Sequence, residues 1–243
     1  MDSPKRTARL AGLLYVLASI PGAFAFLYVP GRLVVEGDAT ATADRIRASE
    51  PLLRAGIAAE LVGITIFVFV ALVLYRLFRP VSEGHALAML VLYLVSVPIS
   101  FIDILAEVAA LHIANGGGSG FLKAFDAPQR DALTYLGLDL HVLGIRVAQV
   151  FWGLWLFPFG VCVIRSRFIP RILGVLLMVA GVGHTAEALA RLTLPAHSAD
   201  SVGRITSILT FGEPPMILWL LIFGARPRRP AAATPAPDVT AAR

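Results

Sequence analysis

Six long stretches of the chain contain very few charged residues, and they constrain its fold more than any other feature. Each is long enough for an α-helix to cross the ~30 Å hydrocarbon core of a lipid bilayer, which takes about 20 residues. Of the 243 residues, 57% are hydrophobic and 15% are charged, whereas soluble domains typically contain about 25% charged residues. A protein in contact with the lipid bilayer is therefore expected. The predicted spans are residues 9–29, 55–78, 86–113, 135–164, 172–194 and 207–225.

The six stretches predict an all-α fold, a polytopic membrane bundle of six transmembrane helices. Hydrocarbon offers no hydrogen-bond partner to an open strand edge, and no stretch has the alternation of apolar and polar residues that a barrel strand requires. Residues 1–225 are therefore expected to form a single transmembrane domain. The tail, residues 226–243, is rich in proline and has no apolar periodicity, so we expect it to be disordered.

The distribution of Lys and Arg predicts the orientation in the membrane. Cytoplasmic loops carry an excess of these residues, and the loop at 165–171 contains three arginines and no acidic residue. This pattern predicts that both termini lie in the cytoplasm. The same loop charge accounts for the formal net charge of +5, so no nucleic-acid partner is expected.

The N-terminal stretch also has features of a cleavable signal peptide. Lys5 and Arg6 precede an apolar run, and Ala23 and Ala25 provide small residues of the kind found at cleavage sites. The apolar run continues through Val29, however, and this length favours an uncleaved membrane span.

The two longer outer loops are expected to contain short amphipathic helices. Asp38 is a typical N-cap for a helix that follows it. Residues 121–133 begin with apolar Phe121 and Phe125, a pattern of a helix that lies at the level of the lipid headgroups. The glycine-rich stretch 115–120 before this segment predicts a flexible hinge.

Polar residues inside the predicted spans are the candidate functional residues. An acidic side chain near the middle of a membrane helix costs roughly 2.5–3.5 kcal/mol on insertion scales, so these residues should face one another, water or a ligand. Four polar residues of the third span recur every three or four positions and share one helix face. These four are Ser96, Ser100, Asp103 and Glu107. The complete set of candidates is Glu60, Asp103, Glu107, Asp139, His141, Arg146, His184, Glu187, Arg191 and Glu213.

Most of the acidic candidates fall in the outer half of the predicted bundle, which indicates an outward-facing acidic intramembrane cavity. Several ionised carboxylates cannot persist together in a low-dielectric environment without protons or a cation to neutralise them. The leading hypothesis is therefore that the cavity binds or permeates a small cation or polar solute. In this hypothesis negative charge comes from Glu107, Asp139, Glu187 and Glu213, proton exchange from His184, and a counter-charge from Arg146.

A metal-assisted intramembrane enzyme acting on lipid is an alternative. His184 and Glu187 lie three residues apart and share a helix face. Together with Glu60 they form the candidate ligand set for a divalent metal ion that would polarise a water molecule. The sequence contains no His-Glu-x-x-His, no pair of cysteines and no phosphate-binding loop, so no cofactor is identified by a motif.

A non-catalytic helper or sensor subunit is a second alternative. In this interpretation the buried charges only hold the helices together. Asp139 would pair with Arg146, and Glu187 with Arg191. No oligomeric state is predicted.

Four segments of the chain resemble a bacterial membrane family, the domain of unknown function 4386 (DUF4386). They begin at Arg9 (RLAGLLY), Gly37 (GDATATA), Ala124 (AFDAPQ) and Phe168 (FIPRILGVLL), and the last is the most specific. The resemblance covers most of the chain, from Arg9 to Phe223. It implies several membrane helices with an uncleaved first helix in the cytoplasmic membrane of a bacterium. It implies no substrate, because the family has no established activity.

Overall fold

The computed structural model describes residues 3–116 and 120–225, which form helices and turns with no strand in these ranges. A π-helical turn at Phe24–Tyr28 joins the first two α-helices, and short 3-10 segments lie at Gly120–Ala124 and Thr210–Gly212. The α-helices are α1 Pro4–Ala23, α2 Val29–Leu33, α3 Ala39–Ala48, α4 Glu50–Phe78, α5 Glu83–Ala114, α6 Ala127–Leu154, α7 Leu156–Ser166, α8 Arg171–Thr193, α9 Ala196–Leu209 and α10 Pro214–Ile222.

Within the described residues, six helical segments are long and apolar enough to cross a membrane. Their mean hydropathy ranges from 1.5 to 2.7. Three of them combine more than one helix, since α1 continues into α2, α6 into α7, and α9 into α10. The predicted all-α bundle of six candidate spans is thus confirmed. The segments are Pro4–Leu33, Glu50–Phe78, Glu83–Ala114, Ala127–Ser166, Arg171–Thr193 and Ala196–Ile222.

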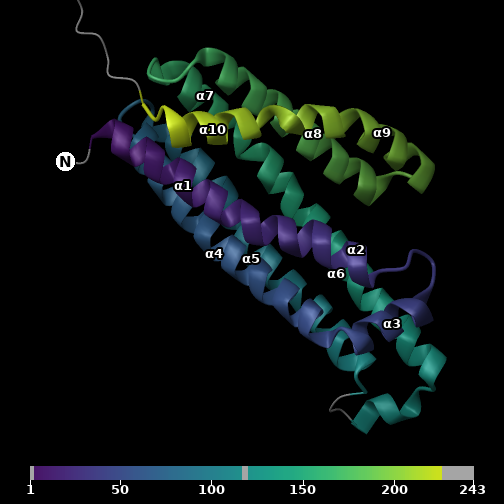
Figure 1. Ribbon diagram of the computed structural model, residues 1–243. Helices are drawn as coiled ribbons and strands as arrows, with labels where there is room; N and C mark the ends of the chain where they lie inside the picture. The colour runs from purple at the N-terminus through teal and green to yellow at the C-terminus, as the bar shows by residue number, and fades with distance from the viewer. Residues whose placement is uncertain (1–2, 117–119, 226–243) are drawn as a thin grey trace, which may run out of the picture.

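The helices form two groups that α6 connects (Figure 1). In one group α1, α4 and α5 run side by side, and in the other α8 packs against α7 and α9. Helix α6 packs against both α5 and α8, while α10 packs on α1. The Arg9 guanidinium donates a 2.8 Å hydrogen bond to the Ile222 carbonyl, so the start of α1 and the end of α10 lie at the same end of the bundle. Which side of the membrane this end faces stays a prediction.

Helix α6 begins earlier than the predicted span because a capping box fixes its start. The Gln129 amide donates to Asp126 Oδ1 at 2.8 Å, and the Asp126 amide donates to the Gln129 side chain at 3.0 Å. Residues 127–133, expected as part of a separate amphipathic segment, therefore belong to α6. Residues 117–119 of the predicted hinge and the predicted disordered tail 226–243 lie outside the described residues.

The sixth segment is interrupted where the sequence contains Pro214 and Pro215. Proline has no backbone N–H to donate and is tolerated only in the first turn of a helix. Helix α9 accordingly ends at Leu209, and α10 starts at Pro214. The interruption places Glu213 directly before the first turn of α10.

Glycines allow α7 and α8 to approach at backbone distance. A Cβ on Gly160 would lie 2.5 Å from the Gly174 carbonyl oxygen, and a Cβ on Gly174 would lie 2.7 Å from the Gly160 carbonyl oxygen. Small residues commonly mediate such contacts between membrane helices, because they let the backbones pack closely. We call this contact the glycine seam.

The loop between the first two candidate spans contains the expected short helix, α3, which is joined to α6 by an ion pair. Asp38 caps α3 by accepting a 2.9 Å hydrogen bond from the Ala41 amide. Arg47 Nη1 lies 2.9 Å from Asp131 Oδ1, and Arg47 Nη2 lies 2.7 Å from Asp44 Oδ1. Hydrogen bonds to Asp131 and Asp44 raise the pKa of Arg47. The guanidinium is therefore charged at every pH at which the protein is handled.

Replacing Arg47 with Met is expected to destabilise the protein by about 1–3 kcal/mol, because the Asp131 side chain, only 6% exposed, then loses its partner. The thermal unfolding midpoint of the purified protein measures this loss. Arg54→Met is the matched control, since Arg54 pairs with Glu50 on the exposed surface of α4 and such pairs contribute about 0–1 kcal/mol. Equal shifts for the two variants would contradict the expectation.

Candidate functional site

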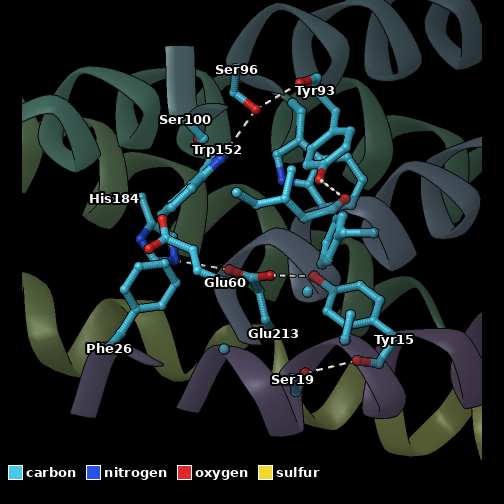
Figure 2. A pocket seen from close by; sticks show the side chains of 16 residues that line it. Tyr15, Ser19, Phe26, Glu60, Tyr93, Ser96, Ser100, Trp152, His184 and Glu213 are labelled. Carbon is cyan, nitrogen blue, oxygen red and sulfur yellow. Dashed lines mark hydrogen bonds and ion pairs between the residues drawn. The ribbon is translucent and has the colours of Figure 1, made fainter. Parts of the chain in front are cut away.

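A cavity of about 210 Å³ lies among the six candidate spans (Figure 2). Its walls come from α1, α4, α5, α6 and α8, and from the residue that precedes α10. Most of the lining is apolar, and the polar groups are few. Concave, mainly apolar sites with a few placed polar groups are typical of small-molecule binding. The acidic groups that line the cavity are Glu60 and Glu213.

Aromatic rings form much of the cavity wall. The Phe67 ring lies 4.7 Å from Tyr15, 4.8 Å from Tyr93 and 5.5 Å from Trp155, measured between centroids. Trp152 donates a 3.2 Å hydrogen bond to Ser96, which links α6 to α5. These rings were not among the predicted site residues, because nothing in the sequence distinguishes them from ordinary core aromatics.

Glu213 joins three helices at one edge of the cavity. The Tyr15 hydroxyl donates to Glu213 Oε2 at 2.6 Å, and His184 Nε2 lies 2.9 Å from Glu213 Oε1. Figure 2 shows the Glu213 carboxylate between these two side chains. The contact connects α1, α8 and the start of α10.

A second set of polar contacts continues from His184 along α6 and α8. Gln149 Nε2 lies 3.4 Å from His184 Nδ1, and Arg146 donates a 2.7 Å hydrogen bond to Gln149 Oε1. Arg146 also lies 3.5 Å from Glu187 Oε1. Arg146 therefore pairs with Glu187 and not with Asp139, and its role as a counter-charge to the cavity stays a prediction.

Three carboxylates surround His141 deep in the bundle. His141 Nε2 lies 3.5 Å from Glu60 Oε2 and 4.0 Å from Glu107 Oε2, while His141 Nδ1 lies 3.1 Å from Asp103 Oδ2. All four residues are buried, as are Ser96 and Ser100 of the predicted polar face of α5. We call Glu60, Asp103, Glu107 and His141 the carboxylate–histidine cluster.

The residues that could hold a metal ion are Glu60, Glu107 and His141, whose candidate ligand atoms all lie within 4.8 Å of one another. This group differs from the set expected from the sequence. His184 pairs with Glu213 and Glu187 with Arg146, so neither joins Glu60 in such a group within the described residues. The i,i+3 spacing does align His184 and Glu187 along α8, but their partners come from other helices.

A comparison with protein-family models matches residues 10–224 to the domain of unknown function DUF4386. The chain belongs to the DUF4386 family. The match includes most of the first described helix and all of the last, in agreement with the resemblance seen in the sequence. Searches of curated proteins and of solved structures found no match.

Three of the ten candidate residues of this DUF4386 protein line the cavity, namely Glu60, His184 and Glu213, and two others lie on the exposed surface. Asp139 is exposed, because it lies two residues before His141 and therefore about 200° around α6 from the buried face. Arg191 is also exposed and pairs with Asp200 of α9 rather than with Glu187. The expected Asp139–Arg146 and Glu187–Arg191 pairs are thus replaced by Arg146–Glu187 and Arg191–Asp200.

Glu60 and His141 of this DUF4386 protein lie farther from the first residue of their helices than the predicted spans implied. Glu60 follows the start of α4 at Glu50 by about 15 Å, and His141 follows the start of α6 at Ala127 by about 21 Å, at ~1.5 Å per residue. The predicted spans began later, near residues 55 and 135. Both groups are therefore well inside the bundle, and Glu60 belongs to both the cavity and the carboxylate–histidine cluster.

Proposed function

We propose that this DUF4386 protein binds a small organic cation of the alkylammonium class in the cavity. The observation that carries the proposal is an aromatic wall next to the carboxylates of Glu60 and Glu213. A cation within about 6 Å of an aromatic ring is attracted by the electron-rich face, and aromatic cages bind quaternary ammonium groups in this way. The carboxylates supply the charge that distinguishes such a ligand from a neutral molecule of the same shape.

The local balance of charge also favours a cation. The contacting groups comprise five carboxylates and one arginine, so even two protonated histidines leave the negative charges in excess. An excess of negative charge inside a membrane protein is unfavourable unless protons or a bound cation neutralise it. The carboxylates are those of Glu60, Asp103, Glu107, Glu187 and Glu213, and the basic groups are those of Arg146, His141 and His184.

The uneven distribution of Lys and Arg supports an orientation with both termini in the cytoplasm of a bacterial cell. In this orientation the Glu60 end of α4 is nearer the outer surface than the Arg76 end. A cation would then enter from the outside, and binding would be the first step of any permeation.

Choline is expected to bind at least about tenfold more tightly than 3,3-dimethylbutan-1-ol, its uncharged analogue, because only choline gains the cation–π and carboxylate interactions. Tryptophan fluorescence can report binding, since Trp152 and Trp155 line the cavity. The Trp219→Phe background removes the remaining tryptophan signal. Equal binding of the two compounds, or binding of neither, would contradict the proposal.

In the same background, Glu213→Gln is expected to weaken choline binding about tenfold, since it removes a charge from the cavity wall. The matched control is Glu83→Gln, because Glu83 is exposed at the start of α5 and pairs with Arg79. Choline affinity should be unchanged in the control. A Glu213→Gln variant that folds and binds choline like the wild type would rule out this carboxylate as the recognition group.

A further inference from the structure

We propose that the carboxylate–histidine cluster is a binding site for a divalent transition-metal ion, with Glu60, Glu107 and His141 as ligands and Asp103 as the residue that positions His141. This site goes beyond the proposed cation cavity, from which it differs in every residue except Glu60. It also differs from the His184–Glu187 set that the sequence suggested.

The geometry separates ligands from a positioning residue. His141 Nε2 faces two carboxylates, at 3.5 Å from Glu60 Oε2 and 4.0 Å from Glu107 Oε2. Two ligands about 2.1 Å from one ion in tetrahedral directions are about 3.4 Å apart. The Glu60–His141 distance is close to this value, and the Glu107–His141 distance is longer by about 0.6 Å. The opposite ring nitrogen, Nδ1, lies 3.1 Å from Asp103 Oδ2. A carboxylate on the second nitrogen of a metal-bound histidine is the usual arrangement that fixes its tautomer and orientation.

Unpartnered polar atoms point to a missing ligand at this site. Glu107 Oε2 and Asp103 Oδ2 are buried and make no hydrogen bond, although both residues are more than nine-tenths buried. His141 Nδ1 likewise makes no aligned hydrogen bond, despite its short distance to Asp103. Buried polar atoms are nearly always satisfied in folded proteins, and a metal ion between Glu107, Glu60 and His141 would satisfy the first of these atoms directly.

The donor atoms select the class of ion. An imidazole nitrogen suits Zn²⁺, Fe²⁺ and related ions, whereas sites for Mg²⁺ and Ca²⁺ use oxygen ligands alone. Two glutamates with a neutral imidazole balance a charge of +2, which favours a divalent ion in a low-dielectric environment. Three protein ligands also leave a coordination position open for water or another molecule. Because Glu60 lines the cavity as well, the site adjoins the space proposed for the organic cation.

Zn²⁺ alone is the first probe, and the protein is used without a polyhistidine tag. After equilibrium dialysis against micromolar Zn²⁺, elemental analysis is expected to find about one tightly held ion per chain. Glu107→Gln and His141→Gln should each lose this ion. Asp103→Asn should keep it with an affinity lowered about 10- to 100-fold, as expected for the loss of a carboxylate that orients a metal-bound histidine.

Two matched controls test whether the loss is specific. His112→Gln removes a histidine that is exposed on α5, and Glu187→Gln removes a half-buried glutamate that pairs with Arg146 outside the cluster. Both should bind Zn²⁺ like the wild type. Failure of the wild type to retain stoichiometric Zn²⁺ would overturn the proposal, as would wild-type affinity in folded Glu107→Gln and His141→Gln.

Binding of Co²⁺ to the wild type provides a measurement that needs no variant. A ligand set of one nitrogen and carboxylate oxygens in a four- or five-coordinate site should give visible absorption bands that Zn²⁺ abolishes by competition. The spectrum of octahedral hydrated Co²⁺ alone would overturn the proposal. Glu213→Gln should retain Zn²⁺ while losing choline affinity, so the failure of one proposal is distinguishable from the failure of the other.

Discussion

Gly160→Val is expected to prevent recovery of folded protein, because it inserts a side chain into the glycine seam. The new Cβ would lie 2.5 Å from the Gly174 carbonyl oxygen and 2.6 Å from Met178 Cγ. Overpacking a core typically costs 1–3 kcal/mol when side chains can adjust. Here the nearest obstacle is backbone, which cannot rotate away, so we expect a cost of about 3 kcal/mol or more. The yield of monodisperse protein in detergent and its helical circular dichroism measure the effect.

Gly84→Val is the control for this prediction. Gly84 lies in the first turn of α5, and a Cβ there would meet no atom within 4 Å. The same change of residue type should therefore leave the yield and the unfolding temperature close to those of the wild type. If Gly160→Val were recovered with wild-type stability, α7 and α8 could not be in backbone contact as described.

Gly144→Ala is the second substitution with a large expected effect, and it acts on the carboxylate–histidine cluster. A Cβ on Gly144 would overlap the Asp103 carboxylate and would lie 2.9 Å from Asp103 Cβ. Asp103 is buried, and its Cβ as well as its carboxylate would be too close to the new methyl group, so we expect a loss of about 1–3 kcal/mol in the free energy of unfolding. The displaced carboxylate should also lower the affinity for Zn²⁺ by about 10- to 100-fold.

A double substitution tests the cause of this loss. Asp103→Ala removes the carboxylate that Gly144→Ala would strike, so the double variant should be more stable than the sum of the two single effects predicts. Gly63→Ala is the control, because a Cβ at this helical glycine would make only ordinary contacts, the nearest at 3.5 Å. Additive effects of Gly144→Ala and Asp103→Ala would contradict direct contact between the two positions.

The sequence was sufficient to predict the six helical segments, because apolar length and helix-breaking residues are local properties. Pro214 and Pro215 lie at the interruption before α10, although the predicted sixth span was continuous, and the polar face that includes Asp103 and Glu107 is buried as its spacing indicated. The start of α6 was missed, although Asp126 and Gln129 have the spacing of a capping box. The apolar pattern alone placed that boundary too late.

The composition of the site could be predicted only in part, because spacing along a helix does not tell which neighbouring helix a face meets. His184 and Glu213 are 29 residues apart in the sequence, yet their side chains are in contact. On α6 both Asp139 and His141 are polar, but they point in opposite directions, and only the packing of α5 against α6 selects His141 for the interior. The pattern of residues along each helix therefore did not predict which helices pack together, and this packing determines the composition of the site.

Because α10 packs on α1, folding of this protein in the membrane must follow a fixed order of steps. Gly12 of α1 faces the backbone of α10, with its Cβ position 2.8 Å from the Leu220 carbonyl carbon, and Tyr15 donates to Glu213 just before α10. The ribosome synthesises α1 before the other helices described here and α10 after them. The side of α1 that contacts α10 must therefore remain exposed to lipid or to the insertion machinery until α10 has been made. The polar interior is enclosed only when this last segment has been inserted.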